Sequence, residues 1–376
     1  QRFGFASHKT GSAYFLLSRI VGASFRLYLI GMVLDAFILG PLGVPFAATV
    51  AATIVLIWLY TFRGGIKTVV WTDTLQTAAM LIAVILTVFA LGNKMDLGIG
   101  GMVDTISKSD YSQWFFFEGG WSDPNNFFKQ FLGGAFLTIV MTGLDQDMMQ
   151  KNLTCRNLRD AQKNMFTFSG VLFIVKLLFV ALGAMLYIYA ASINLEMPTR
   201  SDALYPTLAL EHLGPVIGSV FIIGLIAAAY SSADSALTAL TTSFCVDMLE
   251  IEKKSLSEKQ SFNIRSLVHV GFAVVLFIVI LIFHEVNNDA VINSLFKVAG
   301  YTYGPLLGLF AFGLFTKRQV QDNLVPIVCI LAPVLCYILS ANSEALLNGY
   351  KFGFELLILN GLLTFGGLFA ISRTNV

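Results

Sequence analysis

Charged residues are scarce in this sequence. Of its 376 residues only 12% are Asp, Glu, Lys or Arg, whereas 56% are apolar, and the mean hydropathy is +0.75. Such a composition indicates a polytopic membrane protein. A net charge of +1, together with the lack of a basic aromatic patch, argues against a nucleic-acid partner.

Cysteine and histidine are also few. The four cysteines lie on or near apolar stretches without the spacing of metal ligands, so we interpret them as small apolar residues. The four histidines are scattered, and no pair of nucleophile and base stands out. We therefore expect neither a cysteine-bound metal nor an enzyme.

Ten apolar runs are long enough to cross a bilayer core of ~30 Å. They lie at 12–39, 45–62, 69–91, 127–150, 164–190, 214–247, 265–284, 289–316, 323–341 and 352–372. If these spans alternate in direction, most Lys and Arg residues fall on one side, which the positive-inside rule makes cytoplasmic. We expect an all-α protein in the plasma membrane, surrounded by lipid bilayer, with both ends of this sequence in the cytoplasm.

The connection at 93–126 is long, aromatic and rich in glycine, and it lies outside on this topology. A loop of this length is often a lid, but Trp114 and Trp121 equally suit the aromatic belt at the membrane interface. We favour the belt.

Two spans are interrupted by glycine or proline. Gly143 and a polar run break the fourth span, and Gly300, Gly304 and Pro305 break the eighth. Transporters use such breaks to free backbone groups for ligands near the middle of the membrane. Glycine is also common in ordinary membrane helices, so each break alone is weak evidence.

One span turns polar half way along. Residues 214–249 begin with an apolar half and continue with hydroxyl groups and one carboxylate. These are Ser231, Ser232, Asp234, Ser235, Thr238, Thr241 and Thr242. Oxygens buried in a bilayer need a polar partner, and hard oxygens along one stripe suit a small hard cation. The alternative is a helix-packing face rich in small residues.

Ionisable residues within the spans are candidates for function. They are Arg19, Arg26, Asp35, Asp73, Asp145, Asp147, Lys176 and Asp234. Asp73 and residues 231–235 fall in the same half of the membrane, so one carboxylate and several neutral oxygens can meet there around a cation. Asp73 has the alternative of a carboxylate at a helix N-terminus, and Lys176 that of an ion pair with Asp145 or Asp147.

The stretch at 60–76, YTFRGGIKTVVWTDTLQ, closely resembles the turn and helix start shared by sodium/solute symporters, the family of the sodium/glucose and sodium/proline carriers. Its matching residues at the family spacing are Gly64, Gly65, Trp71, Thr72, Asp73 and Gln76. The polar span at 214–249 and the run DQDMMQK, with Gln146 and Gln150, are similar to two further elements of that family. The likeness extends over essentially the whole chain.

The resemblance implies a LeuT-like core of two inverted repeats that works by alternating access. It assigns 1–92 to the remainder of the first repeat, with three spans, 127–316 to the second repeat, with five, and 317–376 to two accessory spans. Because the sequence does not begin with Met, we expect the family's N-terminal helix and first two core helices to precede it.

The resemblance also implies site residues. Ala228, Ser231 and Ser232 would line the main sodium site, and Asp73 with Ser235 a second one. The sequence departs from the family at Asp234, where many members have no carboxylate; an extra carboxylate there would add to the second site.

For the substrate, Arg26 is similar to an arginine with which the sialic-acid branch holds a carboxylate, and Lys176 to a lysine of the sugar branch. Asp145 and Asp147, on either side of Gln146, stand where sugar carriers have an amide and an aromatic residue, which argues against a sugar.

The sequence therefore predicts a sodium-coupled symporter that imports a small polar organic solute. A sugar, sialic acid or another carboxylate, and an amino acid are the candidates. The alternative is the membrane sensor domain of a signalling protein built on the same fold.

Overall fold

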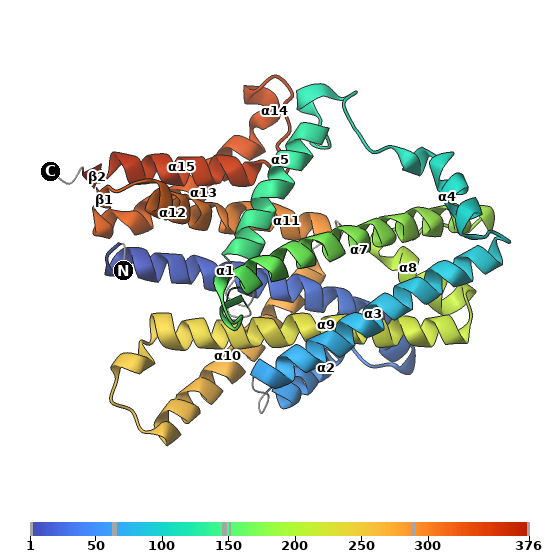
Figure 1. Ribbon diagram of the computed structural model, residues 1–376, viewed down its shortest axis with the longest axis horizontal. Coiled ribbons are helices and arrows are strands. Elements are labelled where there is room, and N and C mark those ends of the chain that lie inside the picture. The colour runs from blue at the N-terminus through green and yellow to red at the C-terminus, as the bar shows by residue number, and fades with distance from the viewer. Residues whose placement is uncertain (1–2, 62–65, 145–148, 150–151, 287–289, 374–376) are drawn as a thin grey trace.

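Helices make up most of the protein (Figure 1). The computed structural model describes residues 3–61, 66–144, 149, 152–286 and 290–373. In these residues one short antiparallel strand pair joins β1 (Gln319–Val320) to β2 (Ser372–Arg373). The predicted all-α class is therefore confirmed.

The first half of the chain contributes long apolar helices and a partly helical connection. They are α1 (Phe5–Leu34), the π-helical η1 (Asp35–Leu39), α2 (Phe46–Thr61), α3 (Ile66–Lys94), α4 (Ile99–Ser107), α5 (Phe127–Thr138) and the π-helical η5 (Ile139–Gly143). α5 gives way to η5, which ends at Gly143, one of the residues of the break predicted in the fourth span. The polar run that follows at 145–148 lies outside the described residues.

The second half adds further helices. They are α7 (Leu158–Ser192), α8 (Leu204–Thr207), α9 (Pro215–Ser243), η8 (Phe244–Met248), α10 (Glu258–Val286), α11 (Val291–Thr302), α12 (Gly304–Phe315), α13 (Val325–Ala341), α14 (Ser343–Leu346) and α15 (Leu356–Ala370). Of these, α9, α10 and α11 pack most closely against α1. The largest apolar core lies between α1, α2, α9, α10 and α11, where Tyr28, Leu240 and Leu276 are fully buried. Burial of these side chains holds α1 and α9 together at the centre of the molecule (Figure 1).

Six helices in the described residues are long and apolar enough to cross a membrane, or seven if α11 and α12 count as one bent span. The apolar parts of α2 and α15 are shorter, with 14 and 15 residues that rise only about 21–23 Å. The expected count of ten spans is therefore not confirmed.

The break predicted in the eighth span is present. α11 and α12 meet at a bend of 45°. Asn360 of α15, which is completely buried, donates its amide to the carbonyl oxygens of Gly300 and Tyr301, both at 3.0 Å. A side-chain carbon at Gly304 would lie 2.2 Å from this amide group, so only glycine fits there.

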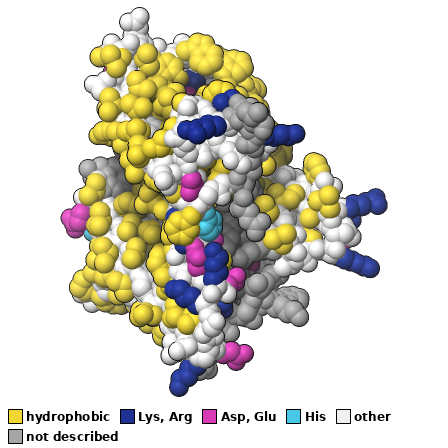
Figure 2. Space-filling model, turned by 90° about the vertical axis from the view of Figure 1, so that its left-hand side faces the viewer, with side chains coloured by type: hydrophobic (Ala, Val, Ile, Leu, Met, Phe, Trp, Pro, Cys, Tyr) yellow, Lys and Arg dark blue, Asp and Glu magenta, His cyan; other side chains and the backbone are white. Residues whose placement is uncertain are grey.

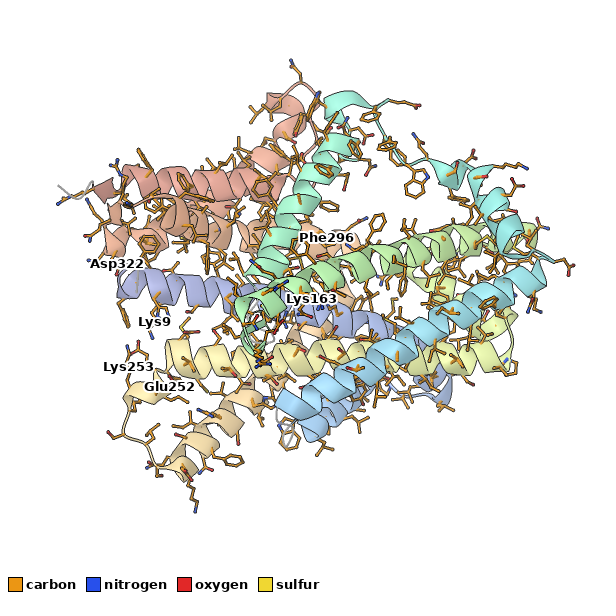
Figure 3. The ribbon with its side chains drawn as sticks, viewed as in Figure 1. Lys9, Lys163, Glu252, Lys253, Phe296 and Asp322 are labelled. Atoms are coloured by element: carbon orange, nitrogen blue, oxygen red, sulfur yellow. The ribbon has the colours of Figure 1, made fainter. Side chains whose placement is uncertain are left out.

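Both chain termini lie at the same end of the molecule (Figure 1). At this end Asp322 accepts hydrogen bonds from the backbone N–H groups of Ala6 and Ser7, at 2.7 and 2.9 Å, and so caps the start of α1. Lys9 forms an ion pair of 2.9 Å with Glu250. Figure 3 shows Lys9 and Asp322 together at this end. The first turn of α1 is thus tied to two other parts of the chain.

A buried lysine ties the long connection before α5 to the segment before α15. Lys129, whose side chain is 1% exposed, donates to the carbonyl oxygens of Trp121, at 3.1 Å, and Lys351, at 2.6 Å. Its ammonium group lies 3.4 Å from the Glu355 carboxylate and 4.0 Å from the ring centroid of Tyr350. A charge is stable in so dry a place only with such partners.

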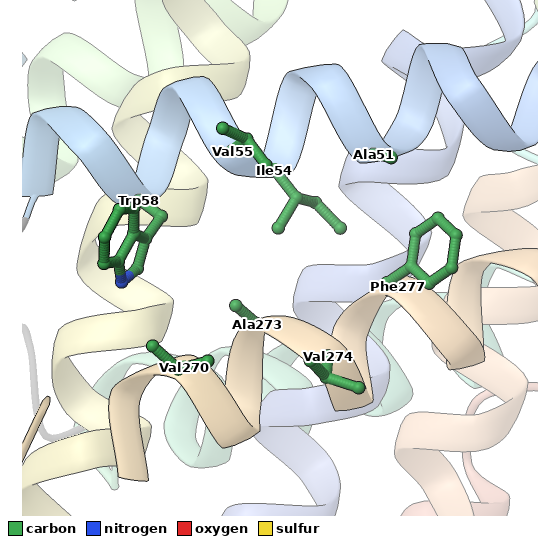
Figure 4. Close-up of a pocket in the computed structure, with 8 residues that line it drawn as sticks. All are labelled: Ala51, Ile54, Val55, Trp58, Val270, Ala273, Val274 and Phe277. Carbon is green, nitrogen blue, oxygen red and sulfur yellow. The ribbon is translucent and has the colours of Figure 1, made fainter. Parts of the chain in front are cut away.

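An apolar groove of about 330 Å³ runs between α2 and α10 (Figure 4). Ile54 of α2 and Ala273 of α10 form its floor, and half-exposed Val55 and Val274 form its rim. All the side chains that line the groove are apolar or aromatic.

Candidate functional site

α3 and α9 lie side by side, and their close approach positions the polar half of α9. Gly224 of α9 faces α3, where a side-chain carbon in its place would lie 2.8 Å from the Cβ atom of Ala83. Glycine permits this approach because it has no Cβ atom. The hydroxyl groups two and three turns further along α9 are therefore held against α3.

The carboxylate of Asp73 meets the polar stretch of α9, as predicted. Oγ of Ser231 donates to Oδ1 of Asp73 at 2.6 Å, and Oγ of Ser235 donates to the carbonyl oxygen of Ser231 at 3.1 Å. Asp73 lies seven residues after Ile66, where α3 begins. It is therefore beyond the first turn, and its position does not fit the alternative of a carboxylate at the helix N-terminus.

The remaining predicted sodium residues lie along the same length of α9. Asp234 is 3% exposed and Ser235 9%, while Ala228 and Ser232 are half-buried. Asp234 comes three residues after Ser231 and so lies within one turn of the Asp73 contact. Asp73 and Asp234 thus lie at a similar level along the polar half of α9.

These groups offer a small cation suitable chemistry. Carboxylate, hydroxyl and backbone carbonyl oxygens are hard ligands, which Na⁺ and other hard cations prefer to nitrogen or sulfur. One formal charge from Asp73 balances one monovalent ion. The hydroxyl groups can turn their lone pairs to the ion while donating their protons elsewhere.

The predicted substrate residues lie on other helices. Arg26 is exposed on α1, between buried Phe25 and Leu27. Lys176 is exposed on α7, in the middle of an apolar helix. Asp145, Gln146 and Asp147 lie outside the described residues.

Sequence reasoning assigned no role to Gln76, which the structure places on the face of α3 that carries Asp73. Its position three residues after Asp73 was the available signal, because residues three apart share a helix face.

The fold and this buried oxygen cluster define a multi-pass membrane carrier of the LeuT-like class. A model of the sodium:solute symporter family matches residues 17–322, and the chain therefore belongs to that family. Sodium is the coupling ion of this family.

Two relatives are bacterial sodium/sialic acid symporters. NanT of Aliivibrio fischeri is 27% identical over 346 residues, which cover 89% of this chain and 66% of the relative. SiaT of Proteus mirabilis is 25% identical over 346 residues, which cover 88% of this chain and 68% of the relative. The mouse sodium-coupled monocarboxylate transporter 1 is 24% identical over 326 residues, which cover 83% of this chain and 51% of the relative. The chain thus spans about two thirds of the sialic acid symporters and about half of the mouse transporter.

A solved structure of a Na⁺-coupled sialic acid symporter, in a substrate-bound outward-open state with a novel Na⁺ site, has the same fold. Its TM-score is 0.79 at 20% identity, with 99% of this chain and 76% of that chain covered. These relatives are carriers, so the comparisons give the sensor alternative no support. The family is one of transporters and not of enzymes, as expected.

Proposed function

We propose that this chain couples the entry of sodium to the uptake of a small organic solute that bears a carboxylate, by alternating access between the two sides of the membrane. The observation that carries the proposal is the 2.6 Å hydrogen bond from Ser231 to Asp73, between two neighbouring apolar helices. A carboxylate and a hydroxyl group held together between two apolar helices are suitable oxygen ligands for a monovalent cation.

Sodium would bind at two neighbouring places. Ala228, Ser231 and Ser232 form the main site, with a backbone carbonyl from Ala228 and two hydroxyl groups. Asp73, Asp234 and Ser235 form or border a second site in the same half of the membrane. The contact between Asp73 and Ser231 supports close coupling, because one residue then borders both sites.

The substrate carboxylate would bind Arg26. A planar guanidinium group holds a carboxylate through two parallel hydrogen bonds, and the exposure of Arg26 at mid-helix supports access to a solute. Lys176 is the second candidate, and Asp145, Gln146 and Asp147 are proposed to complete the site. The names of the sialic acid and monocarboxylate relatives favour an organic acid over a sugar.

The end that carries both termini would face the cytoplasm. Figure 2 looks onto this end and shows Lys and Arg side chains gathered around acidic side chains and a histidine. Such an excess of cationic residues supports a cytoplasmic face. Residues 1–92 and 127–316 would then form the two inverted repeats, with 317–376 as accessory spans.

Uptake into proteoliposomes tests this function. The complete protein is reconstituted, an inward sodium gradient is imposed, and radiolabelled sialic acid, monocarboxylates, amino acids and sugars are compared. We expect sodium-dependent accumulation of at least one carboxylate. Accumulation of a sugar alone would contradict the substrate class, and accumulation that is equal without sodium would contradict the coupling.

A double serine variant tests the proposed sodium site separately. Replacing both Ser231 and Ser232 by Ala should raise the sodium concentration for half-maximal uptake about tenfold or more, since each lost ligand costs ~1 kcal/mol. Ser219→Ala is the matched control, because Ser219 is an exposed residue of the same helix whose hydroxyl donates to its own backbone. Unchanged sodium dependence in a folded double variant would rule the assignment out.

A further inference from the structure

A buried oxygen that accepts no hydrogen bond from the described residues lies next to the proposed sodium site. Gln76 follows Asp73 by three residues on α3, so both side chains project from the same face of the helix. Oε1 of Gln76 is buried, and none of the described residues donates to it. Buried side-chain oxygens are nearly always satisfied, so an orphan acceptor at this place requires an explanation.

The pairing of α3 with α9 shows what this oxygen faces. Asp73 contacts Ser231 at one point. Seven residues further along α3, Met80 lies beside Gly224, and Gly224 is seven residues back along α9 from Ser231. The two helices are therefore antiparallel. A residue that follows Asp73 on α3 lies level with the residue that precedes Ser231 on α9 by the same number of positions.

Gln76 is three residues on from Asp73, and Ala228 is three residues back from Ser231. Gln76 is thus level with Ala228, whose carbonyl oxygen is one of the proposed sodium ligands. The buried amide oxygen lies within one helical turn of the Asp73 carboxylate as well.

We infer that Gln76 supplies a further oxygen ligand for the transported sodium ion, an inference that rests on the sodium site proposed above. An amide oxygen is a hard, neutral ligand, so it completes the shell around a monovalent ion without adding a charge to those of Asp73 and Asp234. Without the ion, the oxygen is buried and accepts no hydrogen bond from the part of the chain that the structure describes. Binding of the ion gives it a partner, which favours sodium over an empty site.

Direct binding of ²²Na⁺ to the purified complete protein tests the inference, with Gln76→Leu as the main variant. Leucine has a similar volume and no oxygen. We expect the variant to bind sodium about fivefold to tenfold more weakly, as for the loss of one neutral ligand. Thr77→Val is the matched control, because Thr77 is the exposed neighbour on the same helix, and it should bind sodium as the wild type does.

Thermal melting separates a ligand from a structural residue. Removing an orphan oxygen leaves no donor unpaired, so Gln76→Leu should melt in sodium-free buffer at or above the wild-type temperature. The rise in melting temperature on adding sodium should be smaller than in the wild type, because the ion binds the folded state less tightly. A sodium-induced rise as large as in the wild type would overturn the inference, since sodium binding would then not depend on the Gln76 oxygen.

Gln76→Glu restores an oxygen at the same place. It should bind sodium more tightly than Gln76→Leu, and increasingly so as the pH rises, because the new carboxylate loses its proton. Sodium binding by Gln76→Leu within twofold of the wild type would overturn the inference. If the Ser231 and Ser232 double variant also bound sodium normally in this assay, the whole sodium site would be wrong and not Gln76 alone.

Discussion

Arg26 presents its charge from the middle of α1, although the residues on either side of it are buried. An ionisable residue in the middle of a membrane helix is a candidate for function. If the solute carboxylate is its partner, the geometry of two parallel hydrogen bonds is essential, and a lysine ammonium cannot reproduce it.

Arg26→Lys should therefore raise the KM for a carboxylate substrate about tenfold or more while the sodium dependence of uptake stays the same. Uptake kinetics in proteoliposomes measure both quantities. Arg159→Lys, an exposed residue near the start of α7, is the control. Normal kinetics for every carboxylate tested would show that Arg26 has a structural role.

The contribution of Glu250 to the stability of the fold depends on pH because of its two lysine partners. Hydrogen bonds from Lys9 and Lys253 lower the pKa of this carboxyl group from its ordinary value of 4.5 to about 2. Because the folded-state pKa is depressed, the carboxylate stabilises the fold above pH 4.5, and this contribution is lost as the pH falls from 4.5 through about 2.

Glu250→Gln should therefore melt below the wild type at neutral pH, and the difference should shrink between pH 4.5 and 2. Melting temperature against pH in detergent measures it. Glu252→Gln, an exposed carboxylate of the same connection, serves as the control. A difference that does not change with pH would contradict this role of the carboxylate.

At the scale of the helix, the bend between α11 and α12 is braced by a neighbour. The amide of Asn360 satisfies two carbonyl groups that the break leaves without helical partners. The bend is thus fixed by α15, although glycine and proline allow it.

Asn360→Ala should lower the free energy of unfolding by about 2–3 kcal/mol, because two buried carbonyl oxygens lose their donor. Chemical or thermal unfolding in detergent measures the loss. Leu362→Ala, at an exposed position of the same helix, should have little effect. Equal stability of Asn360→Ala and the wild type would show that the bend does not depend on the Asn360 hydrogen bonds.

The sequence predicted elements with strong hydropathy signals and residues with a local motif. The long spans of α1, α3, α7, α9 and α10, and the break at Gly304, are visible in the pattern of apolar residues. Asp73 and Ser231 meet as predicted because helix direction and depth follow from topology. The contacts of Asn360 and Lys129 were not predictable, since their partners are backbone carbonyl groups far away in the chain.

At the scale of the whole molecule, two sets of hydrogen bonds hold the beginning and the end of the described chain in one region. β1 and β2 pair the segment after α12 with the end of the described chain, and Asp322 caps α1 in the same region. The C-terminal helices are thereby attached to the helix that carries Arg26. Movements of α1 during transport would have to carry this attached part with them or break its capping hydrogen bonds.

The contacts of Lys129 have a consequence for the connection before α5. Its Trp121 carbonyl accepts from the lysine, and its Ser122 carbonyl accepts from the backbone N–H of Lys351 at 3.3 Å. We propose that these hydrogen bonds to the segment before α15 hold this connection in place, so that it does not move as a lid. An antibody fragment that recognises the exposed ring of Trp121 would accordingly find the same epitope in every stage of the transport cycle, and could mark the carrier without arresting it.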